Sequence, residues 1–378
     1  MSKIVLPAVL LVALAACFTG SASASNATDK AFKASLDKLM KAENGPPGVT
    51  VQIRSSGKSQ YYSRGLGDIP AGTKPKLADH ARIASVAKAF SGGVALSLVA
   101  QGKLKLNDTI GKILPGLWPK ANKVTLAQVL HHTAGLPDYI KDKKFISVLQ
   151  TDPRQFLSPR KLISFVNRKK LEFRPGKKYE YSDSDNIIVG LMAEKVTGLS
   201  YQQLLKRQIG KRLNLTGTTL PKTVNLPRPF LRGYEIEAGM PPADQTKFIN
   251  PALAWASGGI VSTLPDLGRF FRGYVPGSLF GNKIRQAQRS WVKGSSSPPG
   301  PGRNSAGLGI FRYRTKCGTM LGHTGSFPGY RIFAAASLDG RSSIAYIVNA
   351  QIVPGRGSDE VNSLIRASQE AAVCHALG

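Results

Sequence analysis

The amino-acid sequence predicts an α+β fold, in which one antiparallel sheet is built from both ends of the chain and is flanked by helices, with a mostly helical lobe inserted between them. The first observation is an alternation of apolar residues at Val49, Val51 and Ile53, which is typical of a half-buried strand. The second is a series of strand-like segments beyond residue 307, such as "YRIFAAASL" and "SSIAYIVNA". The third is a mostly helical periodicity between about residues 107 and 275. Strands at both ends with helices between them favour one shared sheet.

The first half of the chain begins with a helix over residues 28–43, whose apolar side chains fall on one helical face. The strand "GVTVQIRSS" and its neighbour "SQYYSRGLGD" follow as a hairpin, and a helix that carries Lys88 comes next. Thr125 and Gln128 have the spacing of a capping box before "VLHH", which indicates another helix start.

The second half contains a helix in "SDNIIVGLMAEKVTG", which we expect to open at Ser184 or Asp185 and to close at Gly198. Another helix is predicted in "STLPDLGRFF", with Pro265 in its first turn. Residues 294–307 are rich in glycine, proline and serine and read as a loop. The final segment, "DEVNSLIRASQEAAVCHAL", predicts a helix that covers the sheet together with the first helix.

The amino-terminal 24 residues have the pattern of an export signal. A short basic start precedes "IVLPAVLLVALAA", an apolar run of signal-peptide length that is too short to cross a membrane, and "SASA" offers a cleavage site that ends at Ala24. A second interpretation stays open, because "LAAC" resembles the lipobox of bacterial lipoproteins, in which Cys17 becomes the lipidated first residue. Both interpretations predict an exported protein, periplasmic or extracellular.

We expect residues 25–378 to form a single domain. Its α/β lobe is predicted to comprise approximately residues 28–106 and 285–378, and its helical lobe approximately residues 107–284.

The chain is strongly basic, with 52 Lys and Arg against 22 Asp and Glu and a net charge of +30. These basic residues are spread along the chain, and we find no zinc-finger spacing or RNA-binding signature, so we expect no nucleic-acid partner. For an exported protein the charge favours association with an anionic cell envelope. Solubility alone is an equal alternative.

Two cysteines, Cys317 and Cys374, remain outside the targeting segment, so a disulfide between them is possible in an exported protein, and two buried thiols are the alternative. The five histidines have no metal-binding spacing. We therefore expect no metal and no cofactor.

Ser85 and Lys88 lie three residues apart near the start of an otherwise small and apolar run, "ARIASVAKAFSGGVALSLVAQGKL". On a helix these two side chains meet, and a serine hydroxyl needs a base within hydrogen-bond reach to become a nucleophile. Apolar surroundings disfavour an ammonium group, which suits a lysine that acts as a base. The spacing is common, however, and recurs at sites including Ser35/Lys38, Ser55/Lys58 and Ser158/Lys161, so a surface helix is the alternative.

Two further motifs carry candidate functional groups. Tyr181, Ser182 and Asp183 precede a helix, and a tyrosine hydroxyl that faces a serine and a lysine can relay a proton. His323-Thr324-Gly325-Ser326 lies on a predicted strand, where Thr324 offers a hydroxyl to a substrate carboxylate, Gly325 lets a substrate backbone lie close, and Ser326 follows with a backbone N–H free to point inward. Taken alone, each motif is equally typical of ordinary packing or of a turn.

The order of the three motifs, Ser-x-x-Lys, Tyr-x-Asp and His-Thr-Gly, resembles that of the penicillin-recognising serine hydrolases. The phrases "LAQVLHHTAGLPDY", "FRPGKKYEYSDSDNIIVGLMAEKVTGLSY" and "ASGGIVSTLPDLGRF" are similar to the branch that holds class C β-lactamases, D-alanyl-D-alanine carboxypeptidases and related esterases. The resemblance covers roughly residues 30–375 and implies the β-lactamase/transpeptidase-like version of the fold.

The resemblance also implies the roles of individual residues. Ser85 is acylated, Lys88 accepts or tunes its proton, and Tyr181 shares the acid–base work. The backbone N–H groups of Ser85 and Ser326 form the oxyanion hole. The terminal carboxylate of the substrate is bound by His323 and Thr324, and Asp183 and Gly325 also belong to the substrate-binding set.

Two positions depart from the pattern of the family. Asp183 stands where the family usually has Asn, and a carboxylate near Lys88 favours the charged ammonium, which makes Tyr181 the likelier base. His323 stands where β-lactamases of this branch usually have Lys, and the charge of an imidazole varies near pH 6–7. Both departures favour a carboxypeptidase-like peptidase over a β-lactamase.

The sequence therefore predicts an exported serine hydrolase that works through a Ser85 acyl-enzyme on a small-molecule or peptide substrate, foremost as a D-alanyl-D-alanine carboxypeptidase-like enzyme. An esterase or a β-lactamase on the same site is the alternative, and a penicillin-binding sensor without catalysis comes last. An α/β-hydrolase is disfavoured, because the sequence lacks Gly-x-Ser-x-Gly.

Overall fold

The computed structural model of the chain describes residues 16–355 and 357–378. Most of the predicted export segment, residues 1–15, lies outside the described residues. The predicted cleavage site after Ala24 falls within helix α1 (Ala16–Met40). None of the helices in the described part of the chain is both long and apolar enough to cross a membrane.

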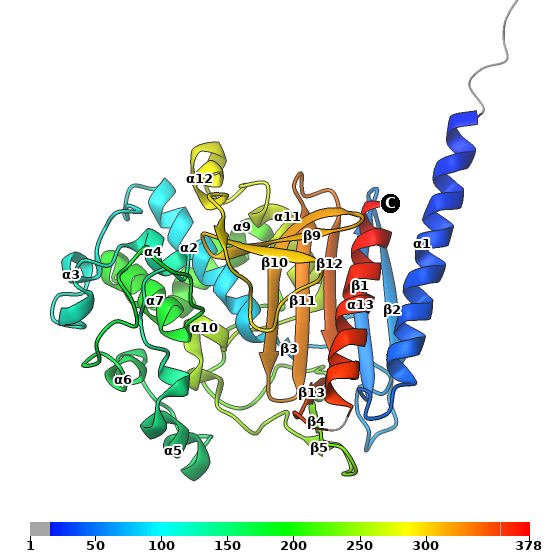
Figure 1. The fold of residues 1–378 in the computed structure, drawn as a ribbon, viewed down its shortest axis with the longest axis horizontal. Coiled ribbons are helices and arrows are strands. Elements are labelled where there is room, and N and C mark those ends of the chain that lie inside the picture. The colour runs from blue at the N-terminus through cyan, green and yellow to red at the C-terminus, as the bar shows by residue number, and fades with distance from the viewer. Residues whose placement is uncertain (1–15, 356) are drawn as a thin grey trace, which may run out of the picture.

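One large antiparallel sheet is assembled from the two ends of the chain, as the sequence predicts. The hairpin from the first third pairs with strands from the last third, because β1 lies between β2 and β12. Figure 1 shows these blue and orange strands side by side. The strand order is β2 (Lys58–Gly65), β1 (Gly48–Ser55), β12 (Ser343–Val348), β11 (Tyr330–Ser337), β10 (Gly318–Phe327), β9 (Ile310–Thr315), β8 (Arg303–Gly307) and β7 (Val292–Lys293).

Two small sheets accompany it. The first joins β13 (Ala350–Ile352), β4 (Tyr234–Ile236) and β5 (Ala243–Asp244), and the second joins β3 (Ala81–Arg82) and β6 (Val261–Ser262).

Helices cover both faces of the large sheet. One face packs against α1 and α13 (Ser358–Leu377), and Phe32 and Leu36 of α1 are fully buried there, as their helical spacing predicts. The other face packs against α11 (Leu264–Tyr274), although this helix lies within the range that we assigned to the helical lobe. Pro265 lies in its first turn, as predicted.

The remaining helices form the lobe on the left of Figure 1. They are α3 (Ile110–Ile113), α4 (Leu126–Leu130), α5 (Lys143–Thr151), α6 (Pro159–Ser164), α7 (Asp183–Thr197), α8 (Tyr201–Leu204), a π-helical turn (Leu205–Gly210), α9 (Lys211–Leu213), α10 (Trp255–Gly258) and α12 (Gly281–Gln288), with short 3₁₀ turns at Pro119–Ala121, Tyr139–Lys141 and Pro251–Leu253. The capping box of Thr125 and Gln128 opens α4, as predicted.

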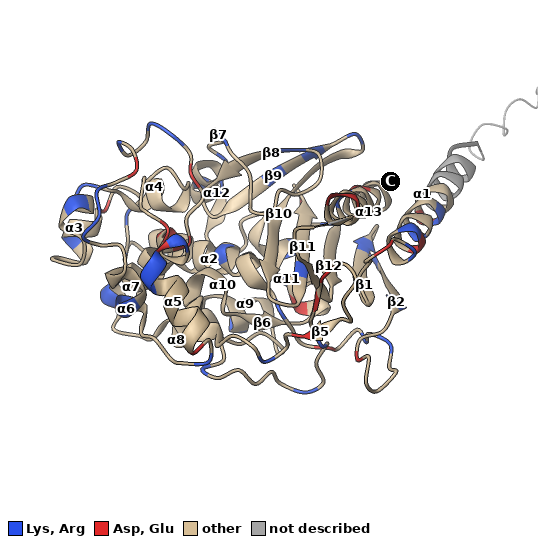
Figure 2. Cartoon of the chain, turned by 60° about the horizontal axis from the view of Figure 1, so that its bottom comes forward, with Lys and Arg blue, Asp and Glu red and all other residues tan. Residues whose placement is uncertain are grey.

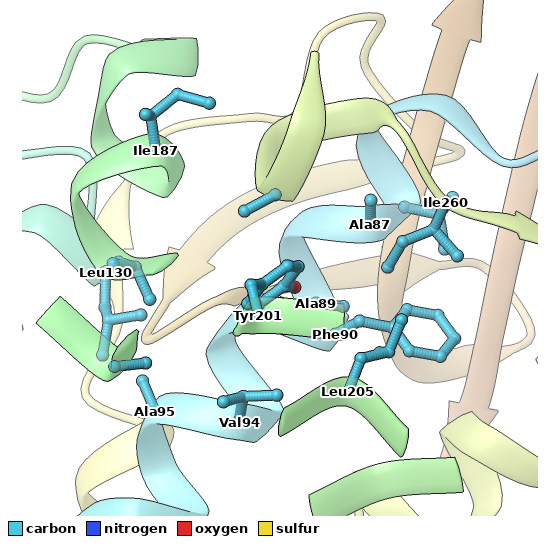
Figure 3. Close-up of a cluster of buried hydrophobic side chains, with 14 of the residues drawn as sticks. Ala87, Ala89, Phe90, Val94, Ala95, Leu130, Ile187, Tyr201, Leu205 and Ile260 are labelled. Carbon is cyan, nitrogen blue, oxygen red and sulfur yellow. The ribbon is translucent and has the colours of Figure 1, made fainter. Parts of the chain in front are cut away.

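Helix α2 (Ala87–Ala100) lies between this lobe and the sheet, and every residue from Ala87 to Leu98 is buried. Figure 3 shows Ala89, Phe90 and Val94 of α2 packed among side chains of neighbouring elements. A helix that is apolar around its whole circumference is stable only when it is surrounded on all sides. Lys88 is the single charged residue of this helix, so its ammonium group lies in the centre of the molecule.

A disulfide joins Cys317 to Cys374, which confirms the paired alternative for the two cysteines. Cys317 lies in the turn between β9 and β10, and Cys374 lies in the last two turns of α13. The bond therefore fixes the end of the carboxyl-terminal helix to the sheet that it covers.

Candidate active site

Ser85 lies in a single 3₁₀ turn (Ala84–Val86) that leads directly into α2. Ala84 has a φ of 51°, in the left-handed region that non-glycine residues rarely adopt and that is common at functional sites. Strand β10 runs alongside this turn. A Cβ atom on Gly325 would lie 2.7 Å from the Ile83 carbonyl oxygen and 3.2 Å from the Ser85 nitrogen. Only glycine therefore lets β10 approach the serine this closely, which is a structural reason for Gly325 besides the predicted contact with substrate.

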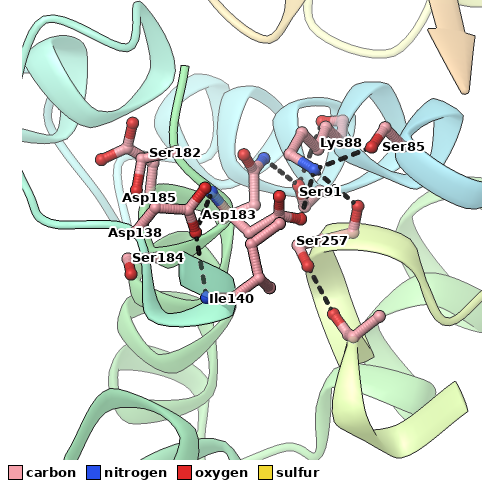
Figure 4. Close-up of polar contacts among 12 residues, drawn as sticks. Ser85, Lys88, Ser91, Asp138, Ile140, Ser182, Asp183, Ser184, Asp185 and Ser257 are labelled. Atoms are coloured by element: carbon pink, nitrogen blue, oxygen red, sulfur yellow. Dashed lines mark hydrogen bonds and ion pairs between the residues drawn. The ribbon is translucent and has the colours of Figure 1, made fainter. Parts of the chain in front are cut away.

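Lys88 is 1% exposed, and its ammonium group has three acceptors. Its Nζ donates to the Ser85 hydroxyl at 3.1 Å, to the Asp183 carboxylate at 2.7 Å and to the Ser257 carbonyl at 3.0 Å. Figure 4 shows these three contacts converging on Lys88 from the Ser85 turn, α7 and α10. The lysines of Ser35/Lys38, Ser55/Lys58 and Ser158/Lys161 are all exposed. Burial and the buried carboxylate partner therefore distinguish Lys88 from these lysines.

Asp183 is the first residue of α7, which begins one to two residues earlier than the sequence indicated and ends at Gly198 as predicted. Its side chain is 13% exposed and forms an ion pair with Lys88. The carboxylate that the sequence placed near Lys88 is thus in direct contact with it, and its effect on the role of Lys88 stays a prediction.

The Tyr181 hydroxyl is buried and has no hydrogen-bond partner within the described part of the chain. The Lys88 Nζ lies 4.9 Å from the centre of its ring. Burial raises the pKa of Tyr181 well above its ordinary value, the Asp183 charge adds to this increase, and the Ser85 hydroxyl opposes it. A phenol with a raised pKa is protonated at neutral pH and can donate a proton. Burial thus disfavours the phenolate in the resting enzyme, and the role of Tyr181 as the likelier base stays a prediction.

His323 and Thr324 lie on β10 and are both buried. Burial lowers the pKa of His323 to about 3, while a contact of its Nδ1 with the Thr324 carbonyl opposes the decrease. The expectation that the charge of His323 varies near pH 6–7 was therefore wrong, because a fully buried imidazole stays neutral there. The Thr324 hydroxyl donates to the Pro298 carbonyl.

Ser326 pairs with Arg331 in the β10–β11 ladder, beside the glycine that contacts the Ser85 turn. Its part in an oxyanion hole stays a prediction, as does the binding of substrate by Asp183, His323, Thr324 and Gly325.

Sequence reasoning missed Asp138, which precedes the 3₁₀ turn at Tyr139–Lys141. Its Oδ1 accepts a hydrogen bond from the Asp183 N–H at 3.2 Å, as Figure 4 shows. Burial raises the pKa of Asp138 to about 7, and the Asp183 charge adds to the increase, whereas Lys88 opposes it. Asp138 belongs to the family-like phrase "LAQVLHHTAGLPDY", but nothing in its spacing connects it to Lys88.

Sequence reasoning also missed the pair His132 and Asp185, of which His132 packs against the Tyr181 ring. His132 lies with its ring centre 4.6 Å from that of Tyr181, and its Nδ1 is 2.7 Å from a carboxyl oxygen of Asp185. Burial lowers the pKa of His132 and raises the pKa of Asp185. Burial thus favours the neutral form of both groups, and the contact between them holds His132 against the tyrosine ring. Within the described residues no cluster of His, Cys, Asp and Glu has the arrangement needed to hold a metal ion.

Comparison with known proteins places these residues in a family context. Residues 32–366 match the family described as "Beta-lactamase". Among curated proteins, "Protein flp" of Staphylococcus aureus strain N315 is 28% identical over 208 residues, which cover 53% of this chain and 40% of that protein. "Putative penicillin-binding protein PbpX" of Bacillus subtilis strain 168 is 25% identical over 275 residues, which cover 71% of this chain and 62% of that protein. The chain thus matches less than two thirds of the length of these relatives.

Solved structures match over nearly the whole chain. A D-stereospecific amidohydrolase from Streptomyces sp. has a TM-score of 0.78 and 27% identity, over 90% of this chain and 98% of that one. The D-amino acid amidase from Ochrobactrum anthropi SV3 has a TM-score of 0.79 and 23% identity, over 91% and 98% of the two chains. The second likeness shows the fold alone.

Proposed function

Because the chain belongs to the beta-lactamase family of serine hydrolases, we propose that it is an exported hydrolase of amide bonds that follow a D-amino acid, in the manner of a D-alanyl-D-alanine carboxypeptidase. The observation that carries the proposal is the contact of Ser85 with a buried lysine that is itself paired with a carboxylate. The preference for D-configured amides is supported by the likeness to a D-stereospecific amidohydrolase.

The geometry suggests how the reaction proceeds. The Ser85 oxygen attacks the substrate carbonyl carbon, and its proton passes to the Lys88 Nζ at 3.1 Å once Lys88 has given one of its own protons to Asp183 at 2.7 Å. The protonated Tyr181 hydroxyl is placed to donate a proton to the leaving nitrogen as the carbon–nitrogen bond breaks. The proton that Lys88 took from Ser85 then passes to the Tyr181 oxygen, and Asp183 returns its proton to Lys88. Water then cleaves the Ser85 ester and releases the acid.

An esterase on the same site is the second candidate, because the same acyl-enzyme serves esters. A β-lactamase is less favoured, because His323 stands where β-lactamases of this branch usually have Lys.

The test of the nucleophile is covalent labelling. A fluorophosphonate or fluorescent penicillin should add one adduct, on the peptide that contains Ser85, and Ser85→Ala should abolish it. Ser55→Ala, at another Ser-x-x-Lys pair, is the matched control and should label like the wild type. Labelling that survives Ser85→Ala would exclude Ser85 as the nucleophile.

The substrate class is tested by a turnover panel of a D-Ala-D-Ala peptide, its L-Ala-L-Ala counterpart, a D-amino acid amide, a short-chain ester and a cephalosporin. We expect the D-configured amides to turn over and the L-peptide and cephalosporin not to. Turnover of the ester alone would favour the esterase, and rapid multiple turnover of the cephalosporin alone would overturn the proposal.

Export is proposed from the apolar amino-terminal segment and is supported by the Cys317–Cys374 disulfide, since such bonds persist in oxidising compartments. Mass spectrometry of the native amino terminus distinguishes the two routes: a start at Ser25 indicates a secreted protein, and a diacylated Cys17 indicates a lipoprotein. An intact Met1 would contradict both.

Association with an anionic envelope is proposed from the net charge of +30.

A further inference from the structure

A basic groove of about 900 Å³ lies beside the loop that leads to Tyr181. Its lining contains no aspartate or glutamate. Figure 2 shows that Lys and Arg are spread over many elements, so basic residues alone do not mark a site in this protein. This groove differs because its lining has no acidic residue and because it lies next to the loop before Tyr181. We call this cavity the anion groove, and its charged side chains are Lys177, Lys178, Lys293 and Arg366.

The four basic side chains of the anion groove come from three separate elements. Lys177 and Lys178 lie in the loop before Tyr181, Lys293 ends β7, and Arg366 lies on α13. All four are exposed, and none takes part in an ion pair within residues 16–355 and 357–378. The nearest acid along the chain, Glu180, is directed to Lys141 at 3.9 Å. The positive charges of the groove are thus left without a partner in the protein.

The anion groove also connects to the catalytic strand. A smaller cavity of about 320 Å³ is lined by Thr324 and Gly325 of β10, and it shares Pro299 and Arg366 with the anion groove. Gly325 is the residue that packs against the Ser85 turn. A chain that extends from the Ser85 region along β10 would therefore pass this cavity, which holds Asp359 as well as Arg366, before it reaches the lysines.

We propose that the anion groove binds carboxylates of an acidic peptide, and that the substrate is such a peptide rather than a single amino acid amide. This inference rests on the proposed peptidase function. A peptide is favoured over a phosphate polymer because the groove lies beside the loop that carries Tyr181, at a site proposed for amide cleavage. Several cations with no acid between them concentrate negative charge and raise the rate of encounter.

The test uses two peptides that end in D-Ala-D-Ala and differ only upstream, where one carries two glutamates and the other two glutamines. The wild type should prefer the acidic peptide in kcat/KM by about tenfold at low salt, the scale of a few exposed ion pairs, and the preference should fall in 0.5 M NaCl. In the triple variant Lys177→Gln/Lys178→Gln/Arg366→Gln the preference should approach one. Lys103→Gln/Lys105→Gln, beyond the far end of the 14-residue α2, is the matched control and should keep it.

A binding measurement keeps this inference separate from the proposed function. Ser85→Ala should bind the fluorescent acidic peptide more tightly than the neutral one by anisotropy, whether or not the wild type cleaves either peptide. Equal binding of the two peptides, or a preference that survives the triple variant, would overturn the inference. Tighter binding of inorganic polyphosphate than of the acidic peptide, lost in the triple variant, would assign the groove to a phosphate polymer and would also overturn it.

Discussion

Replacement of Asp138 by asparagine tests whether a protonated carboxyl group lies beside the Lys88–Asp183 ion pair. Asparagine keeps an oxygen that can accept from the Asp183 N–H at 3.2 Å and from the Ile140 N–H at 3.4 Å, so the local hydrogen bonds can persist. What the substitution removes is the ability to ionise. It should therefore act on the pH dependence of stability rather than on the fold.

The magnitude follows from the pKa of Asp138, which burial raises from 3.8 to about 7. Such a difference corresponds to roughly 4 kcal/mol between the two protonation states. Below pH 3.8 the folded and unfolded chains both hold the proton. As the pH rises towards 7, the unfolded chain releases it while the folded chain retains it, so the free energy of unfolding falls until the folded group ionises as well. Between pH 5 and pH 8 the loss should be about 3 kcal/mol.

The assay is urea unfolding followed by tryptophan fluorescence at pH 5 and pH 8, in the wild type and in Asp138→Asn. The variant should gain about 3 kcal/mol relative to the wild type when the pH is changed from 5 to 8. Asp37→Asn, which removes an exposed carboxyl on α1, is the control and should show little pH-dependent difference. If the free energies of unfolding of the wild type and Asp138→Asn differ by the same amount at pH 5 and pH 8, Asp138 does not have a raised pKa.

Three further outcomes follow from the structure. Lys88→Ala should slow acylation by a fluorescent penicillin at least ~10²-fold, the usual scale for loss of a general base, and unchanged labelling kinetics would exclude that role. Cys317→Ser/Cys374→Ser should lower the free energy of unfolding by about 4 kcal/mol, because the bond closes a loop of 57 residues; equal stability of the oxidised wild type and the variant in denaturant would contradict this. His323→Asn should change the KM of the peptide but not the way that KM varies with pH between pH 5 and 8, because the pKa of His323 is about 3. If the variant lacks a step near pH 6 that the wild type shows, His323 titrates there.

The fold could be predicted because its determinants are local. The alternation at Val49, Val51 and Ile53 identifies β1, and the all-round apolar character of α2 marks it as a buried helix. The start of α7 was placed too late, because Ser182, Ser184 and Asp185 all suit a helix start and the local sequence does not choose between them. The helix begins at Asp183, whose N–H donates to Asp138. Helix α11 packs on the sheet although it belongs to the middle of the chain, which is a property of the tertiary arrangement.

The site could be predicted only in part, for the same reason. Ser85, Lys88 and Tyr181 belong to motifs whose order along the chain is informative. Asp138 and His132 act through contacts with residues 45 and 53 positions away, and no spacing along the sequence reveals such contacts. Burial was also underestimated. It lowers the pKa of His323 to about 3, so that the imidazole is neutral near pH 6–7, and it raises the pKa of Tyr181.

The charge balance of the buried cluster explains how an ammonium group is tolerated in the middle of the molecule. Lys88 and Asp183 compensate each other at 2.7 Å. Burial raises the pKa values of Asp138, Asp185 and Tyr181 and lowers those of His132 and His323, so the surrounding groups favour their neutral forms. A single compensated pair costs far less than several unpaired buried charges. Among these groups, Asp138 has its pKa raised to about 7. Its ionisation adds a second negative charge next to Asp183, and acylation of Ser85 should therefore change near neutral pH in the wild type but not in Asp138→Asn.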